Sequence, residues 1–125
     1  MQPDFYNAFC RHASDADLLL ECKRWANADH LYGIAAECAI KALLQIQGIN
    51  FAENCTSSDR KYWVHINKLW DKYLSFMQTR DACEISDINP FQNWDIAQRY
   101  AHEDDITEQT GRKADHRLGM HELIT

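Results

Sequence analysis

Apolar residues recur at helical spacing along most of the chain, and the clearest pattern lies between Ala26 and Gln47. A stripe with i, i+3, i+4, i+7 and i+11 spacing predicts one amphipathic helix over this range. Gly48 follows directly, and glycine favours the position after a helix end. Small residues on one side would let a neighbouring helix approach closely. The stripe consists of Leu31, Ile34, Ala35, Cys38 and Ala42.

Further helices are predicted on both sides of this segment. Residues 4–24 form the first helix, and a pattern beginning at Ser14 resembles a capping box, so an interruption there stays open. Turn-prone residues occupy 49–61, and an apolar stripe then predicts a helix over 64–80. A final helix is expected to begin near residue 112 and to run to the chain end.

Asn89 and Pro90 predict the start of a fourth helix, because asparagine is a good N-cap and proline suits the first helical turn. Convincing alternation with a period of two is absent from the sequence, which argues against a sheet. We therefore expect an all-α protein, an up-and-down bundle of four to five helices. The expected buried side of the fourth helix carries Phe91, Trp94, Ala97 and Ala101.

Composition supports one helical domain over residues 1–125. A chain of this length can bury a core without disulfides, and 46% of its residues are hydrophobic. Only 4 glycines and 2 prolines are present, which are fewer turn-forming residues than an all-β domain of this length needs. The 5 cysteines form no C-x-x-C pair, so we expect reduced thiols, a cytoplasmic protein and no metal or other cofactor.

We expect neither a signal peptide nor a membrane span. The N-terminal residues lack a charged start followed by an apolar run. The most apolar stretch, residues 31–46, is interrupted by charged and polar side chains and fits a core helix. The formal net charge is −6, so any contact with nucleic acid should be a local cleft and not a broad basic face.

Three short segments together carry a family resemblance. Residues 28–44 (ADHLYGIAAECAIKALL) combine small residues with an embedded acid, Glu37, and a following lysine, Lys41. Residues 64–70 (VHINKLW) place a histidine ahead of a leucine-rich face, and residues 94–102 (WDIAQRYAH) carry an arginine and a histidine. In this order and at this separation, the segments resemble the HEPN (higher eukaryotes and prokaryotes nucleotide-binding) domains.

The resemblance implies a four- or five-helix bundle that is commonly a homodimer. Many HEPN domains are metal-independent endoribonucleases, toxins or anti-phage defence modules, whose arginine and histidine meet those of a second copy. Others are non-catalytic modules that bind a nucleotide or a partner, often a nucleotidyltransferase antitoxin. The family's ribonuclease motif has four to six residues between arginine and histidine, whereas Arg99 and His102 are separated by two. Catalysis and binding of RNA or a nucleotide are both left open.

Arg99, His102 and Glu37 are the candidate catalytic residues. A histidine titrates near neutral pH and can move the proton of a ribose 2′-hydroxyl, while an arginine can hold the phosphate. On a helix, a spacing of three would put Arg99 and His102 on neighbouring surface, and Glu37 could orient either one. The alternative is a solvated face on which Glu103 and Asp104 are their ion partners.

His65, Lys41 and Tyr100 are the candidate substrate-binding residues. His65 opens the predicted third helix, so it is either a cap or core-edge residue or a second residue of the cleft. Lys41 follows Glu37 by four positions, the order that favours an ion pair within one helix. Tyr100 is either a packing aromatic or a contact for the substrate.

Overall fold

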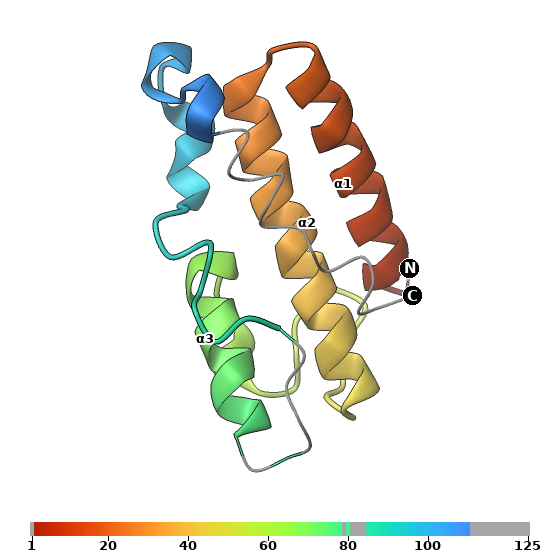
Figure 1. Cartoon of the computed structure of the whole chain (residues 1–125). Coiled ribbons are helices and arrows are strands. Elements are labelled where there is room, and N and C mark those ends of the chain that lie inside the picture. The colour runs from red at the N-terminus through yellow and green to blue at the C-terminus, as the bar shows by residue number, and fades with distance from the viewer. Residues whose placement is uncertain (1, 79, 81–84, 111–125) are drawn as a thin grey trace.

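The computed structural model describes residues 2–78, 80 and 85–110, and it is an all-α helical bundle, as predicted (Figure 1). Its long α-helices are α1 (Phe5–Glu21), α2 (Trp25–Ile46) and α3 (Ile66–Met77), and residues 108–110 are also α-helical. Short 3-10 helices accompany them, namely η1 (Arg60–Tyr62), η2 (Ile96–Tyr100) and η3 (Glu103–Asp105).

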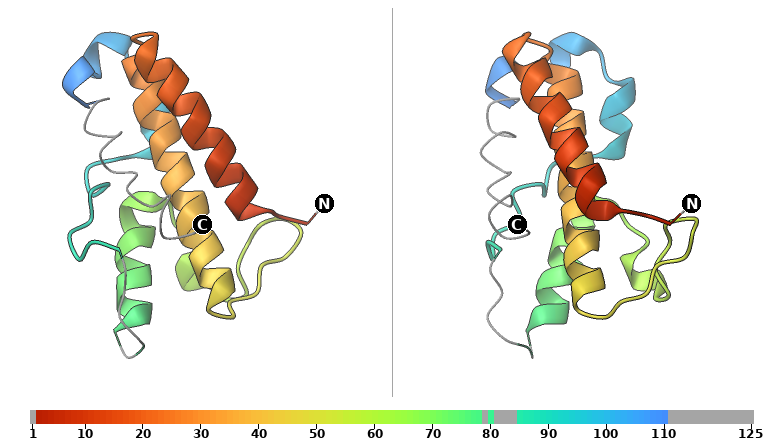
Figure 2. Two further views of the ribbon diagram at one scale, coloured as in Figure 1. Left: turned by 45° about the vertical axis from the view of Figure 1, so that its right-hand side comes forward. Right: turned by 90° about the vertical axis from the view of Figure 1, so that its right-hand side faces the viewer.

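The central element of the bundle is α2. Helix α1 lies antiparallel beside it, and α3 packs against its C-terminal half (Figures 1 and 2). The 3-10 helices η2 and η3 contact α2 at the opposite end, where α1 turns into α2. Lys23 makes this turn tight by adopting a left-handed φ of 61°.

Small residues let α1 and α2 lie close together, as the sequence predicted. The first helix is continuous through Ser14, so the interruption considered there is not present. Ser14 is exposed, while its neighbours Ala13 and Ala16 keep the inner side of α1 apolar. Asp4 starts the helix by accepting a hydrogen bond from the Asn7 amide (2.9 Å). The α2 alanines in the core are Ala28, Ala35, Ala36, Ala39 and Ala42.

The predicted boundaries of α2 are correct to within one residue at each end. Gly48 follows the helix with φ of 98°, the left-handed conformation that glycine adopts without strain. Helix α3 is shorter than the predicted range 64–80, but it buries the expected side chains. These include Ile66, Leu69, Trp70, Tyr73 and Met77.

The prediction of a fourth α-helix after residue 89 is wrong. The chain forms turns there and continues into η2 and η3. Asn89 caps a turn: its Oδ1 accepts a hydrogen bond from the Phe91 amide (2.8 Å), and its Nδ2 donates to the Asn67 carbonyl of α3 (2.7 Å). Ala97 and Ala101 are exposed, because this segment lacks the 3.6-residue period on which their predicted burial depended.

Trp94 directs the course of this segment. Its indole Nε1 donates to the backbone carbonyl of Asp29 on α2 (3.1 Å). The ring lies where Gly33 has no side chain, so the indole can rest directly on the α2 backbone. Phe91 and Trp94 are buried, as predicted, and they attach an irregular segment to a regular pair of helices.

The fifth helix, expected from residue 112 onward, lies outside the described residues. Within residues 2–78, 80 and 85–110, no helix combines the length and apolar character that crossing a bilayer requires. Cys10, Cys22, Cys38 and Cys55 are free thiols.

Candidate functional site

The predicted site residues fall into two groups. Glu37, Lys41 and His65 lie together between the middle of α2 and the start of α3. Arg99, Tyr100 and His102 lie at the end of the bundle where α1 turns into α2. The structure therefore does not bring Glu37 to Arg99 within one chain.

Glu37 forms the centre of the first group. Its Oε1 lies 2.9 Å from His65 Nδ1, and its Oε2 lies 3.6 Å from the Lys41 ammonium. The Glu37 side chain is 14% exposed and that of His65 is 50% exposed. The ion pair with Lys41 is the one that the sequence spacing favoured. The imidazole is an additional partner, which a spacing of 28 residues does not reveal.

The backbone at the start of α3 turns His65 toward α2. His65 is the N-cap residue of α3, with extended φ and ψ of −83° and 173°, and its side chain does not cap the helix. Its ring is consequently free to reach Glu37. Together with Lys41, these residues line a pocket of about 160 Å³, which we call the Glu37 pocket.

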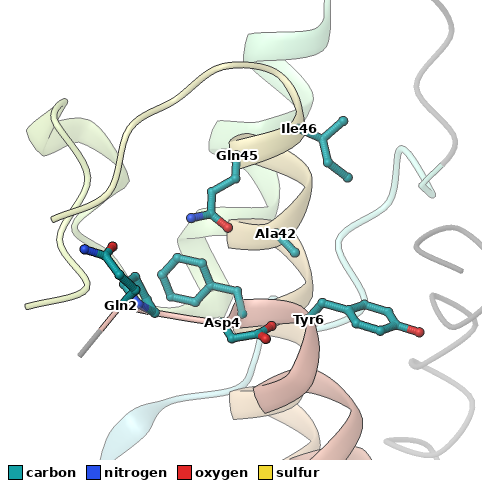
Figure 3. A pocket seen from close by; sticks show the side chains of 8 residues that line it. Gln2, Asp4, Tyr6, Ala42, Gln45 and Ile46 are labelled. Carbon is teal, nitrogen blue, oxygen red and sulfur yellow. The ribbon is translucent and has the colours of Figure 1, made fainter. Parts of the chain in front are cut away.

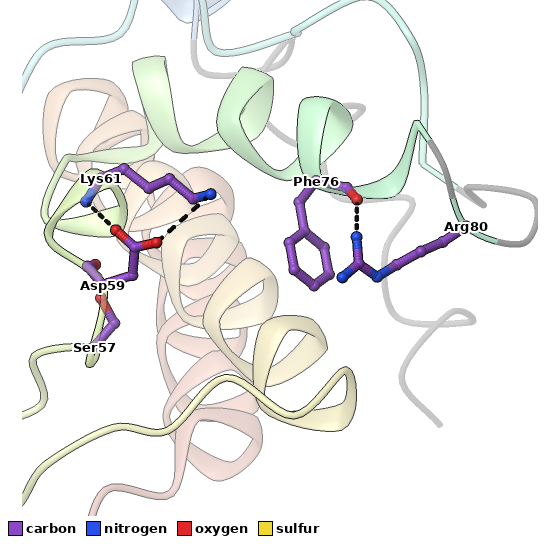
Figure 4. A network of polar contacts seen from close by, with 5 residues as sticks. All are labelled: Ser57, Asp59, Lys61, Phe76 and Arg80. Carbon is purple, nitrogen blue, oxygen red and sulfur yellow. Dashed lines mark hydrogen bonds and ion pairs between the residues drawn. The ribbon is translucent and has the colours of Figure 1, made fainter.

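The segment before α3 forms the other wall of the Glu37 pocket. Asp59 accepts a hydrogen bond from the Lys61 amide (3.0 Å) and an ion pair from its ammonium (3.6 Å), which shapes η1 (Figure 4). Trp63 donates through Nε1 to the Ser57 carbonyl (2.9 Å), and its indole is half exposed. The guanidinium of Arg60 lies 5.3 Å from the centre of an indole ring of Trp63.

Arg99 belongs to a second depression, which we call the Arg99 cleft. The cleft has a volume of about 370 Å³ and lies between η2, η3 and the turn from α1 to α2. Lys23 and Arg24 line it from the turn, and Glu103 and Asp104 line it from η3. Three cationic side chains and two carboxylates thus share one opening, together with the partly buried indole of Trp25.

Tyr100 and His102 are exposed beside this cleft. The Arg99 guanidinium lies 4.8 Å from the centre of the Tyr100 ring, and Tyr100 is 77% exposed. His102 caps η3, where its Nδ1 accepts a hydrogen bond from the Asp104 amide (3.1 Å). In the neutral ring this leaves the proton on Nε2. Because η2 ends at Tyr100 and His102 precedes η3, Arg99 and His102 do not share a helix face, which corrects that expectation.

A buried carboxylate that was not identified from the sequence contacts the segment that carries Arg99. Asp29 is 2% exposed, and its Oδ2 accepts a hydrogen bond from Gln98 Nε2 (2.7 Å). Gln98 Oε1 in turn accepts from the Asp95 amide (2.8 Å), which completes a capping box on η2. Asp29 stands directly beside the buried Ala28, and an acid at a buried helix position is the signal that could have identified it.

His30 also connects α2 with this segment. Its ring stacks on Trp94, with ring centres 5.6 Å apart. Burial lowers the pKa of His30 below its usual value, and the positive charge of Arg99 lowers it further. His30 Nδ1 is buried and has no hydrogen-bond partner within the described chain. The neutral ring is therefore the form that this packing favours.

A third pocket, of about 580 Å³, lies between the N-terminal segment and the end of α2 (Figure 3). Ala42 and Ile46 face it from α2, and Tyr6 faces it from α1. Asp4, the acid at this pocket, already serves as the N-cap of α1. This pocket therefore offers shape but little chemistry.

Thiols and metal ligands add no further site in the described residues. Burial raises the pKa of the Cys38 thiol to about 11, and the neighbouring Glu37 contributes to that rise, so this thiol is unreactive near neutral pH. No cluster of three or more histidine, cysteine, aspartate or glutamate side chains in the described chain is arranged to hold a metal ion. Comparison of the sequence and the structure with known families, curated proteins and solved structures finds no match.

Proposed function

We propose that this chain is a HEPN-like module of a toxin or anti-phage system that binds a nucleotide or single-stranded RNA in the Arg99 cleft. The observation that carries this proposal is the convergence of Lys23, Arg24 and Arg99 on one opening in a chain of net charge −6. An acidic protein is expected to meet nucleic acid at such a local cleft and not over a broad face.

The side chains around the cleft suit a nucleotide. Arg99 provides a planar, permanently charged donor for phosphate oxygens. The exposed ring of Tyr100 can stack on a base, and such stacking tolerates any sequence. Glu103 and Asp104 on the rim repel additional phosphates, which favours a short or single-stranded ligand over a long duplex.

Fluorescence anisotropy with a labelled single-stranded oligoribonucleotide tests this proposal. Arg99→Ala should weaken binding about tenfold, because hydrogen bonds to charged groups contribute roughly 1.5–3 kcal/mol. The slope of log K against log salt should fall by about 0.7, the value for one lost phosphate contact on a single strand. Arg80→Ala is the matched control.

Arg80 is a suitable control because its removal changes the net charge equally, away from the cleft. Its guanidinium donates to the Phe76 carbonyl (2.6 Å) and lies over the Phe76 ring at the end of α3 (Figure 4). Equal affinities of wild type and Arg99→Ala, or equal losses in Arg99→Ala and Arg80→Ala, would refute binding in the Arg99 cleft.

A second candidate function is metal-independent endoribonuclease activity of a homodimer through Arg99 and His102. It is favoured by the exposure of both side chains at the same end of the bundle. Because Glu37 is engaged by His65 and Lys41, an acid for this pair would have to come from elsewhere, such as a second copy. RNA cleavage in EDTA that disappears in both Arg99→Ala and His102→Ala, by a protein that sediments as a dimer, is the expected result. Cleavage retained by both variants would exclude it.

In a non-catalytic alternative, the chain binds a protein, such as a nucleotidyltransferase antitoxin. It predicts that the neighbouring gene product co-purifies with the chain and that RNA is not cut. The same anisotropy experiment separates it from RNA binding, since Arg99→Ala would then have no effect on oligonucleotide affinity.

A further inference from the structure

The Glu37 pocket contains an arrangement that the Arg99 cleft does not explain. It lies in mid-bundle: Glu37 is ten positions further along α2 than Asn27, which lines the Arg99 cleft, or about 15 Å of helical rise. Glu37 and Lys41 face it from α2, and Trp63 and His65 face it from the chain before α3. An acid, a base and a cation therefore meet beside an aromatic ring.

The contact between His65 and Glu37 fixes the imidazole. With Nδ1 held 2.9 Å from the carboxylate, the tautomer with the proton on Nδ1 is favoured, and Nε2 is left without the proton. The ring is half exposed, whereas Glu37 is largely buried. Nε2 is thus the group that can receive a proton from a ligand. The carboxylate stabilises the imidazolium that results, so Glu37 is a positioning residue.

Lys41 supplies positive charge at the same place. Its ammonium lies 3.6 Å from the second oxygen of the Glu37 carboxylate, and it lines the pocket together with the imidazole. A single carboxylate hence holds both an imidazole and an ammonium. Stabilisation of charge that develops on a phosphate requires a cation so placed.

Trp63 offers a surface for a base beside these groups. Its half-exposed indole is held in position by the hydrogen bond from Nε1 to the Ser57 carbonyl (2.9 Å). Two exposed cations precede it in the chain: Arg60, whose guanidinium lies 5.3 Å from an indole ring centre of Trp63, and Lys61, which pairs with Asp59 at the surface. An aromatic platform flanked by cations is the usual way in which proteins hold single-stranded nucleic acid.

We propose that His65 is the general base of an RNA-cleaving site in the Glu37 pocket, separate from Arg99 and His102. This inference rests on the proposed function only in taking single-stranded RNA as the ligand. His65 Nε2 takes the proton of a ribose 2′-hydroxyl, and the 2′-oxygen forms a bond to the adjacent phosphorus. The bond from phosphorus to the 5′-oxygen breaks. The leaving 5′-oxygen takes a proton from the Lys41 ammonium, and the His65 imidazolium then returns its proton through water to the Lys41 amine.

The products are a 2′,3′-cyclic phosphate and a 5′-hydroxyl, and the step needs no co-reactant. A fluorescent single-stranded oligoribonucleotide in EDTA is the test substrate, with the products identified by mass spectrometry. His65→Asn should reduce the cleavage rate about 100-fold or more, since general acid–base catalysis contributes roughly 10²–10⁴-fold. Asparagine is a favourable N-cap, so this variant retains the start of α3.

Matched variants separate catalysis from structure. His12→Asn removes a histidine of α1 outside both sites and should cleave at the wild-type rate. Added imidazole should restore part of the activity of His65→Ala, which a purely structural role of His65 does not allow. Glu37→Gln should lower kcat and leave KM nearly unchanged, because the carboxylate orients the imidazole and stabilises the imidazolium that forms during the reaction.

The outcomes also separate this inference from the proposed function. If RNA binds with an affinity that depends on Arg99 but is never cut, the proposed catalysis in the Glu37 pocket is refuted and the proposed binding in the Arg99 cleft is supported. Cleavage that survives His65→Asn, or that disappears only in His102→Asn, overturns it as well and assigns the activity elsewhere. Cleavage that requires His65 but not Arg99 supports catalysis in the Glu37 pocket and refutes RNA binding in the Arg99 cleft. A 2′-deoxy oligonucleotide that is cut equally well excludes attack by the 2′-hydroxyl.

Discussion

The α1–α2 hairpin and the segment 85–110 differ in how regular their backbone structure is. The hairpin is two long helices, and each helix contributes buried residues at regular helical spacing, many of them alanines. The segment consists of turns and short 3-10 helices, and it is attached through a few side chains. Trp94 and Gln98 both hydrogen-bond to Asp29 of α2.

This difference indicates how each region responds to substitution. Packing in the hairpin is distributed over many small contacts, so the loss of one contact lowers stability only a little. In the segment, Trp94 and Gln98 are the anchors: each attaches several neighbouring residues to α2, including Arg99 of the candidate cleft. We therefore expect substitutions at the anchors to change both stability and RNA binding, and substitutions in the hairpin to change stability alone.

The largest effect is expected from Gly33→Ala, which acts where the two regions meet. A methyl group at this position would overlap the Trp94 indole, and that ring cannot move aside without losing its hydrogen bond to the Asp29 carbonyl. Overpacking of a tight site costs about 1–3 kcal/mol and more when a buried aromatic ring is displaced. Urea unfolding followed by tryptophan fluorescence measures the loss. An unchanged midpoint would show that Trp94 is not anchored as described.

Asp29→Ala is expected to cost somewhat less, about 1–3 kcal/mol, because it leaves the Gln98 amide without its buried partner. It should also weaken oligonucleotide binding, since η2 carries Arg99. Asp15→Ala on the exposed face of α1 is the control and should stay within about 0.5 kcal/mol. Full RNA affinity in a destabilised Asp29→Ala protein would separate the anchor from the cleft.

Gly48→Ala tests the regular region by itself and should cost about 1 kcal/mol. A methyl group there meets no neighbour within 4 Å, but φ of 98° is unfavourable for alanine. Thermal or urea unfolding gives the size of the effect, and oligonucleotide affinity should not change. A larger loss than that of Gly33→Ala would reverse the proposed contrast.

The smallest effect concerns His12 and His30, whose pKa values are lowered by burial and by a neighbouring arginine. Arg99 acts on His30 across the two regions, whereas Arg11 acts on His12 within α1. Arg99→Ala should therefore raise the pKa of His30 and leave that of His12 unchanged, as measured by NMR titration. Equal responses of both rings would contradict the placement of η2 on α2.

The same shifts predict how stability depends on pH. A histidine with a lowered pKa in the folded state stays neutral there, while the unfolded chain takes up a proton below about pH 6.5. Stability should consequently decrease as the pH falls from about 6.5 toward the lower folded pKa. His30→Asn should flatten this part of the curve.

Sequence periodicity predicted the hairpin well but failed after residue 89. The α2 boundaries and the alanine contacts follow from spacing alone, since a helix makes residues four apart neighbours wherever it occurs. Asn89 and Pro90 equally suit a helix start or a turn. The choice depends on Asn67 and on Asp29, which lie far away in the sequence.

The candidate site was predicted in part for the same reason. The spacing of Glu37 and Lys41 identified their ion pair, and the pair is present. The expectation that Glu37 orients Arg99 was wrong for the single chain, because the two residues line different pockets. Arg99 lies in a 3-10 helix at the other end of α2 and not in the expected fourth α-helix. His65 was considered as a residue of the cleft, but its contact with Glu37 depends on how α3 starts.

By itself, the sequence determined that this chain is helical and where its two longest helices lie, because local spacing is sufficient for an amphipathic helix. Only the tertiary structure decided which chemical groups meet: His65 with Glu37, and Arg99 with the turn from α1 to α2. The physical reason is that such contacts join residues far apart in the sequence. They depend on where an indole or a buried carboxylate finds its partner, which no local pattern contains.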